Sequence, residues 1–300
     1  MPEQAHGALI GGRYRLVETI GQGGMGRVWR AVDELLGRPV AVKEMRLDGA
    51  GAEDSLVRRE RALREARATA RIDHPHVVRV YDVAEADARL WIVMELVPAR
   101  SLAQALTDDG PLSVPEAARI GLALASALRV VHAAGVLHRD IKPANVLLER
   151  AERGRPERGR PEQEHPAPLD RVVLTDFGIA ALQDAAALTR TGLLVGSPEY
   201  IPPERLLGRT QGPPSDLWSL GATLCTAVSG RSPFARATTP ATLHAIAYES
   251  PELPLDTPDV TPLLTALLAK DPTDRPTADE TATRLTTLIA APSPRPGPSP

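Results

Sequence analysis

The chain has 300 residues, 43% hydrophobic and 24% charged, which is the composition of an ordinary globular protein with a real core. This composition excludes the collagen-like, wholly disordered and disulfide-scaffold classes. With 35 basic and 38 acidic side chains the formal charge is −3, so no global attraction favours nucleic acid or an anionic membrane. A lone cysteine, Cys225, can form neither an internal disulfide nor a zinc cluster, which fits a reducing, cytoplasmic compartment.

The N-terminal residues carry no targeting signal. Residues 1–12 lack the basic and apolar regions of a signal peptide, and no window reaches about 18 uncharged apolar residues. We therefore expect no membrane span, and we treat residues 1–13 as an N-terminal extension.

Short β-branched apolar runs predict a small sheet in the first third of the chain. The predicted strands are residues 14–20, 27–32, 40–45, 77–83 and 90–96. One helix, predicted over residues 53–72, interrupts them and ends before Pro75, because the residue preceding a proline avoids helical dihedrals. Residues 14–97 are therefore predicted to form a small lobe.

Beyond Pro98 the pattern changes to long helical stretches. The predicted helices are residues 114–134, 215–229, 239–248, 262–268 and 278–289, with short strands at 146–148 and 172–175. This predicts a larger, mainly helical lobe over residues 98–290 and an α+β fold class. A cleft between two lobes is the usual place for a small-molecule site.

Two segments have almost nothing to bury. Residues 150–170 include the near-repeat Glu-Arg-Gly-Arg-Pro at 152–156 and 157–161, which predicts a disordered surface insertion. Residues 291–300 are rich in proline and show no apolar periodicity, which predicts a Pro-rich tail.

The first chemical signal is a glycine-rich run between two predicted strands. It reads Gly21-Gln-Gly23-Gly24-Met-Gly26-Arg-Val28. A Rossmann fingerprint would open a helix after its glycines, whereas here a strand resumes. This favours a hairpin whose backbone can approach phosphate oxygens, with a plain glycine-rich hairpin as the alternative.

The second signal is Val40-Ala-Val-Lys43, a lysine that ends an apolar alternating strand. Its ammonium would lie near the glycine hairpin, where it could neutralise phosphate. Such a lysine needs a carboxylate to orient it, and Glu65, on the inner face of the predicted helix, is the preferred candidate. Glu60 is a fallback at a different helical phase, and a solvated helix charge is the alternative for Glu65.

The strongest signal is His138-Arg-Asp140-Ile-Lys142-Pro-Ala-Asn145, followed by Asp176-Phe-Gly178. Together with the glycine run and Lys43, these residues match the protein-kinase signature set in order and in lobe placement. The chain resembles the eukaryotic-like serine/threonine protein kinases of bacteria over roughly residues 14–289. The resemblance implies the bilobal protein-kinase fold, with a small antiparallel sheet and one main helix in the N-terminal lobe and a larger, mainly α-helical C-terminal lobe.

The same resemblance implies ATP and Mg²⁺ as cofactors, with Mn²⁺ as an allowed substitute. Asp140 would accept the proton of the substrate hydroxyl, and Lys142 would stabilise the transferring phosphate. Lys43, paired with Glu65, would hold the α and β phosphates. Asp176 and Asn145 would bind Mg²⁺ through hard oxygen ligands.

The implied nucleotide site consists of the glycine hairpin, an apolar slot for adenine and the backbone of residues 95–97, which form the connector between the lobes. Its residues are Ile20, Gly21, Gly23, Gly24, Gly26, Val28, Ala41, Lys43, Met94, Glu95, Val97 and Leu147. For the apolar members, simple core packing is the alternative.

Control and bracing residues follow from the resemblance as well. Thr189 and Thr191 lie where family members carry regulatory phosphothreonines, with Thr191 favoured, and Arg139 could pair with such a phosphate. The resemblance also implies that Glu204 pairs with Arg275, and that Asp216 braces the backbone of the catalytic loop.

These features predict a kinase that phosphorylates Ser and Thr hydroxyls of proteins and autophosphorylates its own activation loop. Family analogy allows a homodimer for phosphorylation in trans, and no feature indicates a nucleic-acid partner. The alternative is a pseudokinase scaffold that binds nucleotide without turnover. A small-molecule kinase is a third candidate, against which residues 196–200 and 202–204 resemble a platform for protein substrates.

Overall fold

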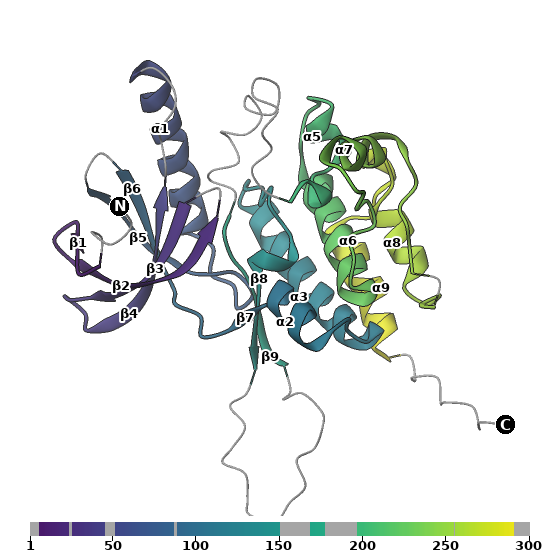
Figure 1. Ribbon diagram of the computed structural model, residues 1–300, viewed down its shortest axis with the longest axis horizontal. Helices are drawn as coiled ribbons and strands as arrows, with labels where there is room; N and C mark the ends of the chain where they lie inside the picture. The colour runs from purple at the N-terminus through teal and green to yellow at the C-terminus, as the bar shows by residue number, and fades with distance from the viewer. Residues whose placement is uncertain are drawn as a thin grey trace, which may run out of the picture.

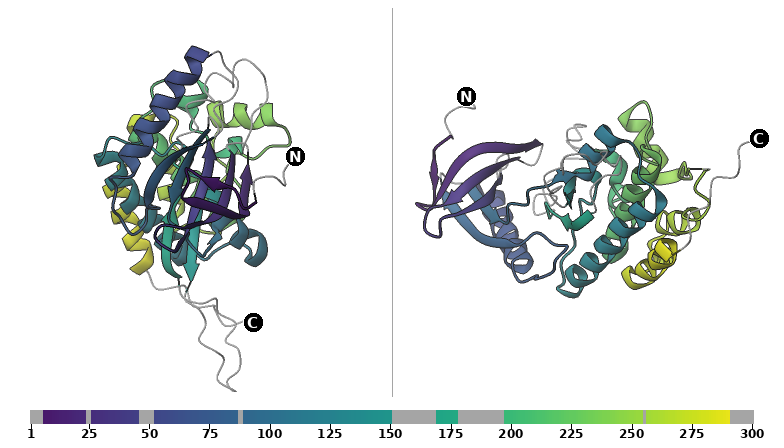
Figure 2. Two further views of the ribbon diagram at one scale, coloured as in Figure 1. Left: turned by 90° about the vertical axis from the view of Figure 1, so that its left-hand side faces the viewer. Right: turned by 90° about the horizontal axis from the view of Figure 1, so that it is seen from below.

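The computed structural model describes residues 6–23, 26–45, 52–86, 89–150, 169–177, 197–254 and 256–290. A strand-rich lobe lies at one end of the molecule and a helical lobe at the other (Figure 1). The view from below shows the same division, with the purple and blue strands separated from the green and yellow helices (Figure 2, right). The predicted α+β organisation in two lobes is confirmed.

The small lobe is built on a six-stranded antiparallel sheet in the order β1-β2-β3-β4-β6-β5. Its strands are β1 (Leu9–Ile10), β2 (Tyr14–Gly23), β3 (Gly26–Asp33), β4 (Arg38–Met45), β5 (Val80–Ala86) and β6 (Arg89–Met94). β2 and β3 pair directly across the glycine run, with Gly21 opposite Val28. The predicted glycine hairpin is therefore present.

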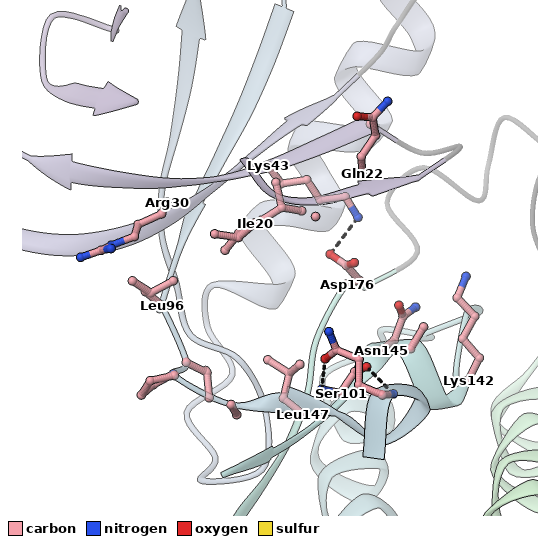
Figure 3. A pocket seen from close by; sticks show the side chains of 18 of the residues that line it. Ile20, Gln22, Arg30, Lys43, Leu96, Ser101, Lys142, Asn145, Leu147 and Asp176 are labelled. Atoms are coloured by element: carbon pink, nitrogen blue, oxygen red, sulfur yellow. Dashed lines mark hydrogen bonds and ion pairs between the residues drawn. The ribbon is translucent and has the colours of Figure 1, made fainter. Parts of the chain in front are cut away.

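Alternation along β4 and β6 sends side chains into two separate cores. Ala41 and Met94 pack beneath α1 (Ala52–Thr69), whereas Val42 and Val93 pack on the opposite face of the sheet. This is the period-two pattern of a strand that is buried on both sides. It leaves Lys43, on the α1 side with Ala41, buried and pointing toward the other lobe (Figure 3).

The sheet curls so that its two edges approach each other. The Tyr14 hydroxyl on β2 donates to Asp82 on β5 at 2.6 Å, and Arg13 reaches the same carboxylate at 3.6 Å. Burial and this hydrogen bond raise the pKa of Tyr14, so the phenol stays a donor. The curl encloses the apolar residues that β1, β2, β3, β4 and β6 turn away from α1.

The large lobe consists of helices packed around a small three-stranded sheet, β7-β8-β9. Its strands are β7 (Arg100–Ser101), β8 (Val146–Arg150) and β9 (Leu169–Leu174). Its helices are α2 (Leu102–Asp109), α3 (Val114–Ala133), α5 (Pro203–Leu206), α6 (Pro213–Ser229), α7 (Thr239–Tyr248), α8 (Thr261–Leu267) and α9 (Ala278–Ala290), with short 3₁₀ turns η2 (Pro143–Asn145), η3 (Pro198–Tyr200) and η4 (Pro272–Asp274).

The central helix α3 begins at a complete capping box. The Ser113 hydroxyl accepts from the Glu116 backbone N–H, and the Glu116 carboxylate accepts from the Ser113 backbone N–H. From there α3 buries one face against α6 and α9, with Leu124 and Leu128 fully buried. Among the described residues, no helix is both long enough and apolar enough to cross a membrane.

Several predicted boundaries differ from those in the structure. Within the predicted N-terminal extension, Leu9–Ile10 form β1, which adds a strand to the sheet and buries Ile10. The strand predicted to begin at Val77 begins at Val80, because Val77 forms a bridge with Leu174 of the large lobe instead. The strands β8 and β9 extend into the predicted 150–170 insertion, whose residues 151–168 lie outside the described residues.

Candidate active site

A cavity of about 880 Å³ lies between the lobes (Figure 3). The small lobe contributes Ile20, Gly21, Gln22, Gly26, Val28 and Lys43 to its walls. The connector and the large lobe contribute Leu96, Val97, Asp140, Lys142, Asn145, Leu147 and Asp176. The polar residues of all three chemical motifs found in the sequence therefore meet around one hollow.

An ion pair crosses this cavity. The Lys43 ammonium donates to Asp176 Oδ1 at 2.9 Å, and Lys43 is only 6% exposed. Burial alone would raise the pKa of Asp176, but the ammonium of Lys43 holds it below its usual range. Asp176 is therefore a carboxylate anion, the form that can bind a cation.

Glu65 does not bind Lys43, contrary to the expectation from the sequence. Its carboxylate accepts from the Arg139 guanidinium at 2.5 Å, while Lys43 is engaged by Asp176. The helical phase was correct, since Glu65 points inward and Glu60 is exposed. The partner differs because α1 places Glu65 within reach of Arg139 in the large lobe.

The Asp140 carboxylate is held by two neighbours from its own loop. Lys142 Nζ donates to its two oxygens at 3.0 and 2.8 Å. Asn145 Nδ2 donates to the Asp140 carboxylate and to its backbone carbonyl, both at 2.8 Å. These contacts fix the orientation of a carboxylate that lines the cavity.

The loop of residues 138–145, which the resemblance identifies as the catalytic loop, is anchored by Asp216 of α6. Its carboxylate accepts from the backbone N–H groups of His138 at 2.9 Å and Arg139 at 2.8 Å. His132 Nε2 lies 2.8 Å from the same carboxylate. Burial lowers the pKa of His138, whose neutral ring packs against Phe177 at 4.7 Å between centroids.

Asp176 and Asn145 form a donor set that fits Mg²⁺ bound together with a nucleotide. Mg²⁺ usually takes one or two carboxylate or amide oxygens from the protein, while substrate phosphates and waters complete its octahedron. Asn145 uses its amide nitrogen on Asp140, which leaves its Oδ1 as an oxygen ligand. Both residues line the same cavity.

The glycines of the hairpin differ in what the fold requires of them. At Gly26, with φ of 132°, an added Cβ would lie 2.1 Å from the Glu44 carbonyl oxygen, so no other residue fits. At Gly21 an added Cβ would meet only Val28, at 3.7 Å. Packing within the protein therefore explains glycine at position 26 but not at position 21.

The predicted adenine residues divide between the cavity wall and the core. Val28, Val97 and Leu147 line the main cavity. Met94 lines a small hollow of about 20 Å³ behind it, with Lys43 and Asp176 in the shared wall. Ala41 lies opposite Met94 in the sheet. Among the described residues, Ala41 and Glu95 line neither hollow.

Glu204 and Arg275 form the ion pair that the resemblance implies. Two parallel hydrogen bonds of 2.8 Å join them, and both side chains are almost fully buried. The remaining Arg275 donors reach the carbonyls of Ala269, Pro214 and Lys270. Every N–H of this buried guanidinium thus has an acceptor.

Several predicted residues cannot be placed. Gly24, Gly178 and the two proposed phosphorylation sites, Thr189 and Thr191, lie outside the described residues.

Sequence reasoning missed other residues of the cavity. Gln22, Ser101 and Gln104 add polar groups to its walls. Ser101 and Gln104 form the capping box of α2, a signal that is readable as Ser-x-x-Gln in the sequence. Gln22 lies between two glycines and carries no separate signal.

Comparison with known proteins agrees with this geometry. Residues 14–284 match the family model described as the protein kinase domain. The chain belongs to the protein kinase domain family. Together with the names of its relatives, this match confirms the resemblance to bacterial serine/threonine protein kinases.

The kinase domain is similar to several curated bacterial proteins. It is 40% identical to the serine/threonine-protein kinase PknA of Mycobacterium tuberculosis, over 90% of this chain and 59% of that protein. It is 37% identical to the serine/threonine-protein kinase PkaA of Streptomyces coelicolor, over 89% of this chain and 48% of that protein. It is 36% identical to the serine/threonine-protein kinase PrkC of Bacillus subtilis, over 76% of this chain and 32% of that protein. The chain thus spans about a third to three-fifths of these relatives.

The buried pair of Glu204 and Arg275 predicts an acid-dependent loss of stability. Burial opposes ionisation, but Arg275 and Ser215 hold the pKa of Glu204 below its usual 4.5. A lowered carboxyl pKa contributes stability that is complete above about pH 4.5 and is lost as the pH falls through the folded-state pKa. We therefore expect the free energy of unfolding, measured with urea between pH 7 and pH 3, to fall less with decreasing pH in Glu204→Gln than in wild type.

At pH 7 the same substitution should lower the free energy of unfolding by about 3–5 kcal/mol, because it leaves Arg275 buried without its anion. The matched control is Glu18→Gln, which breaks an exposed ion pair with Arg30 and should stay close to wild type. Equal stability of the Glu204→Gln protein and wild type at pH 7 would contradict this reading.

Proposed function

We propose that this kinase domain transfers the γ-phosphate of ATP to serine and threonine hydroxyls of proteins, including its own activation loop. The observation that carries the proposal is the arrangement around the cavity. Asp140 is held as an oriented carboxylate in the wall of the cavity that Lys43, Asn145 and Asp176 also line. The names of the bacterial relatives support the same substrate class.

Phosphoryl transfer requires mainly that the reacting groups are positioned and that the charge on the phosphates is neutralised. Asp140 would orient the substrate hydroxyl and accept its proton as the oxygen bonds to the γ-phosphorus. The bond between that phosphorus and the oxygen bridging to the β-phosphate breaks, and ADP leaves with the electron pair. Lys142, within hydrogen-bonding distance of Asp140, would stabilise the charge on the transferring phosphoryl group.

The nucleotide would bind with Mg²⁺, or with Mn²⁺ in its place, which neutralises the phosphate oxygens. Asp176 and Asn145 would hold the cation. Adenine would occupy the slot between Val28 and Leu147, hydrogen-bonded to the backbone of residues 95–97. The glycine hairpin of β2 and β3 would cover the phosphates.

Phosphate binding by Lys43 requires a change from the arrangement in the structure. Lys43 binds Asp176, and Glu65 binds Arg139. We infer that both ion pairs break on activation. A phosphothreonine at Thr191, or at Thr189, would attract Arg139, and the released Glu65 would then bind and orient Lys43. Because one chain would present its loop to another, this step would use a homodimer.

A binding-only scaffold has no support in the site. Scaffold kinases usually lack at least one of the catalytic or metal-binding residues, whereas Lys43, Asp140, Asn145 and Asp176 are all present around the cavity.

The direct test incubates the purified chain with Mg²⁺ and labelled ATP, beside Asp140→Asn. Wild type should incorporate phosphate into itself and into a generic protein substrate, with mass spectrometry locating it on Thr191 or Thr189. Asp140→Asn should bind ATP with an unchanged Kd and transfer phosphate at least about 100-fold more slowly, the size expected for loss of a general base. Transfer by Asp140→Asn at the wild-type rate would remove the assignment.

The proposed release of Glu65 from Arg139 has its own test. Autophosphorylated wild type should be several-fold more active than the same protein treated with phosphatase, since Arg139 then has a phosphate to bind. In Arg139→Gln this stimulation should disappear. The control is Arg129→Gln, an exposed arginine paired with Asp279, which should keep it. Equal stimulation in Arg139→Gln would rule out this role for Arg139.

A further inference from the structure

The connector that would bind adenine is clamped from outside the cavity by an arginine of β9. Arg171 donates from its two terminal nitrogens to the two carboxylate oxygens of Glu95, at 2.5 and 3.1 Å. Its third donor, Nε, reaches the Pro75 carbonyl at 2.6 Å. Neither Arg171 nor Glu95 lines the cavity among the described residues. Bidentate pairing of this kind fixes orientation as well as distance.

The clamp joins three segments that are far apart in the sequence. The backbone N–H of Glu95 donates to the Arg79 carbonyl at 2.9 Å, which ties the connector to the start of β5. The segment before β5 lies along β9, where Val78 and Leu174 form a backbone hydrogen bond of 3.0 Å. Arg171 therefore lies where the connector, the segment after α1 and the strand leading to Asp176 meet.

We propose that Arg171 is a positioning residue for the nucleotide: through Glu95 it holds the backbone of residues 95–97 in the orientation that adenine requires. This inference rests on the proposed nucleotide site. The clamp acts on the outer side of the connector, so its loss leaves the surface that faces adenine chemically unchanged. What changes is the freedom of the connector to shift relative to β9.

The charge of Glu95 and the partial burial of its ion pair with Arg171 support this role. The hydrogen bonds from Arg171 hold the pKa of Glu95 below its usual range, so the carboxylate is charged at neutral pH. The two side chains are 24% and 19% exposed, which places the pair between a surface ion pair and a buried one. We therefore expect the clamp to affect ligand binding more than global stability.

The test compares Arg171→Gln, Glu95→Gln and the double variant with wild type. Isothermal titration calorimetry would measure the Kd of adenosine, which contacts only the connector side, and the Kd of Mg²⁺-tripolyphosphate, which contacts only the phosphate side. Each single variant should weaken adenosine about 3- to 10-fold, the size expected for coupling within one hydrogen-bond network. Tripolyphosphate binding should not change. The double variant should be no weaker than either single variant.

Steady-state kinetics supply a second readout. In Arg171→Gln the KM for ATP should rise by the same factor as the adenosine Kd, while kcat and the KM for a peptide substrate stay within twofold. Arg171→Lys keeps the charge without the planar fork and should recover part of the loss. A purely structural role would not separate the two KM values.

Two substitutions serve as controls. Glu149→Gln removes the other carboxylate near Arg171, at 3.8 Å, and Arg15→Gln breaks an exposed pair with Glu34 that is remote from the connector. Both should leave adenosine binding unchanged. An unchanged adenosine Kd in Arg171→Gln, or equal weakening of adenosine and tripolyphosphate, would overturn the proposal. Wild type that binds neither ligand would overturn the proposed function itself and this inference with it.

Discussion

The carboxylate of Asp216 is the contact on which the geometry of the catalytic loop depends. It is 1% exposed and receives the backbone N–H groups of His138 and Arg139. Arg139 has φ of 64°, a left-handed conformation that costs an ordinary residue about 1–3 kcal/mol. Such strain persists only where the surroundings over-determine it. The buried carboxylate, anchored in α6, does so here, and Asp140 follows directly in the chain.

Asp176 provides the second strained position, with φ of 60°. Arg139 and Asp176 are the only residues other than glycine with positive φ in the part of the chain that the structure describes. Each also makes an ion pair to the small lobe, Arg139 to Glu65 and Asp176 to Lys43. Both strained residues thus have side chains that connect the lobes, so the charge pattern of the site depends on how the lobes are placed.

Much of this organisation could be predicted from local sequence. Short runs of β-branched apolar residues located most strands, and apolar periodicity located α3 and α6, because these signals act over a few residues. The catalytic residues could be listed because their order along the chain is distinctive. The short strand β1 escaped prediction, since a two-residue strand has no periodicity and depends on Ile10 entering a core formed by other strands.

Choices among distant charges could not be predicted. Lys43, Glu65, Arg139 and Asp176 can pair in more than one way, and which pairs form depends on the position of α1 relative to the catalytic loop. The clamp of Arg171 on Glu95 was missed for the same reason. Its partners are 76 residues apart, and neither belongs to a motif that calls for the other.

The role of Asp216 in orienting the catalytic loop is tested most directly by the rate of phosphoryl transfer in Asp216→Asn and in wild type, with the Kd for ATP measured on both. An amide in this position keeps the shape but offers one acceptor to two backbone donors, so the catalytic loop should lose its fixed orientation. We predict that kcat falls by about 100-fold, as misplacement by about an ångström can cause, while the Kd for ATP and the circular dichroism spectrum stay unchanged. A folded Asp216→Asn protein that transfers phosphate at the wild-type rate would contradict the account.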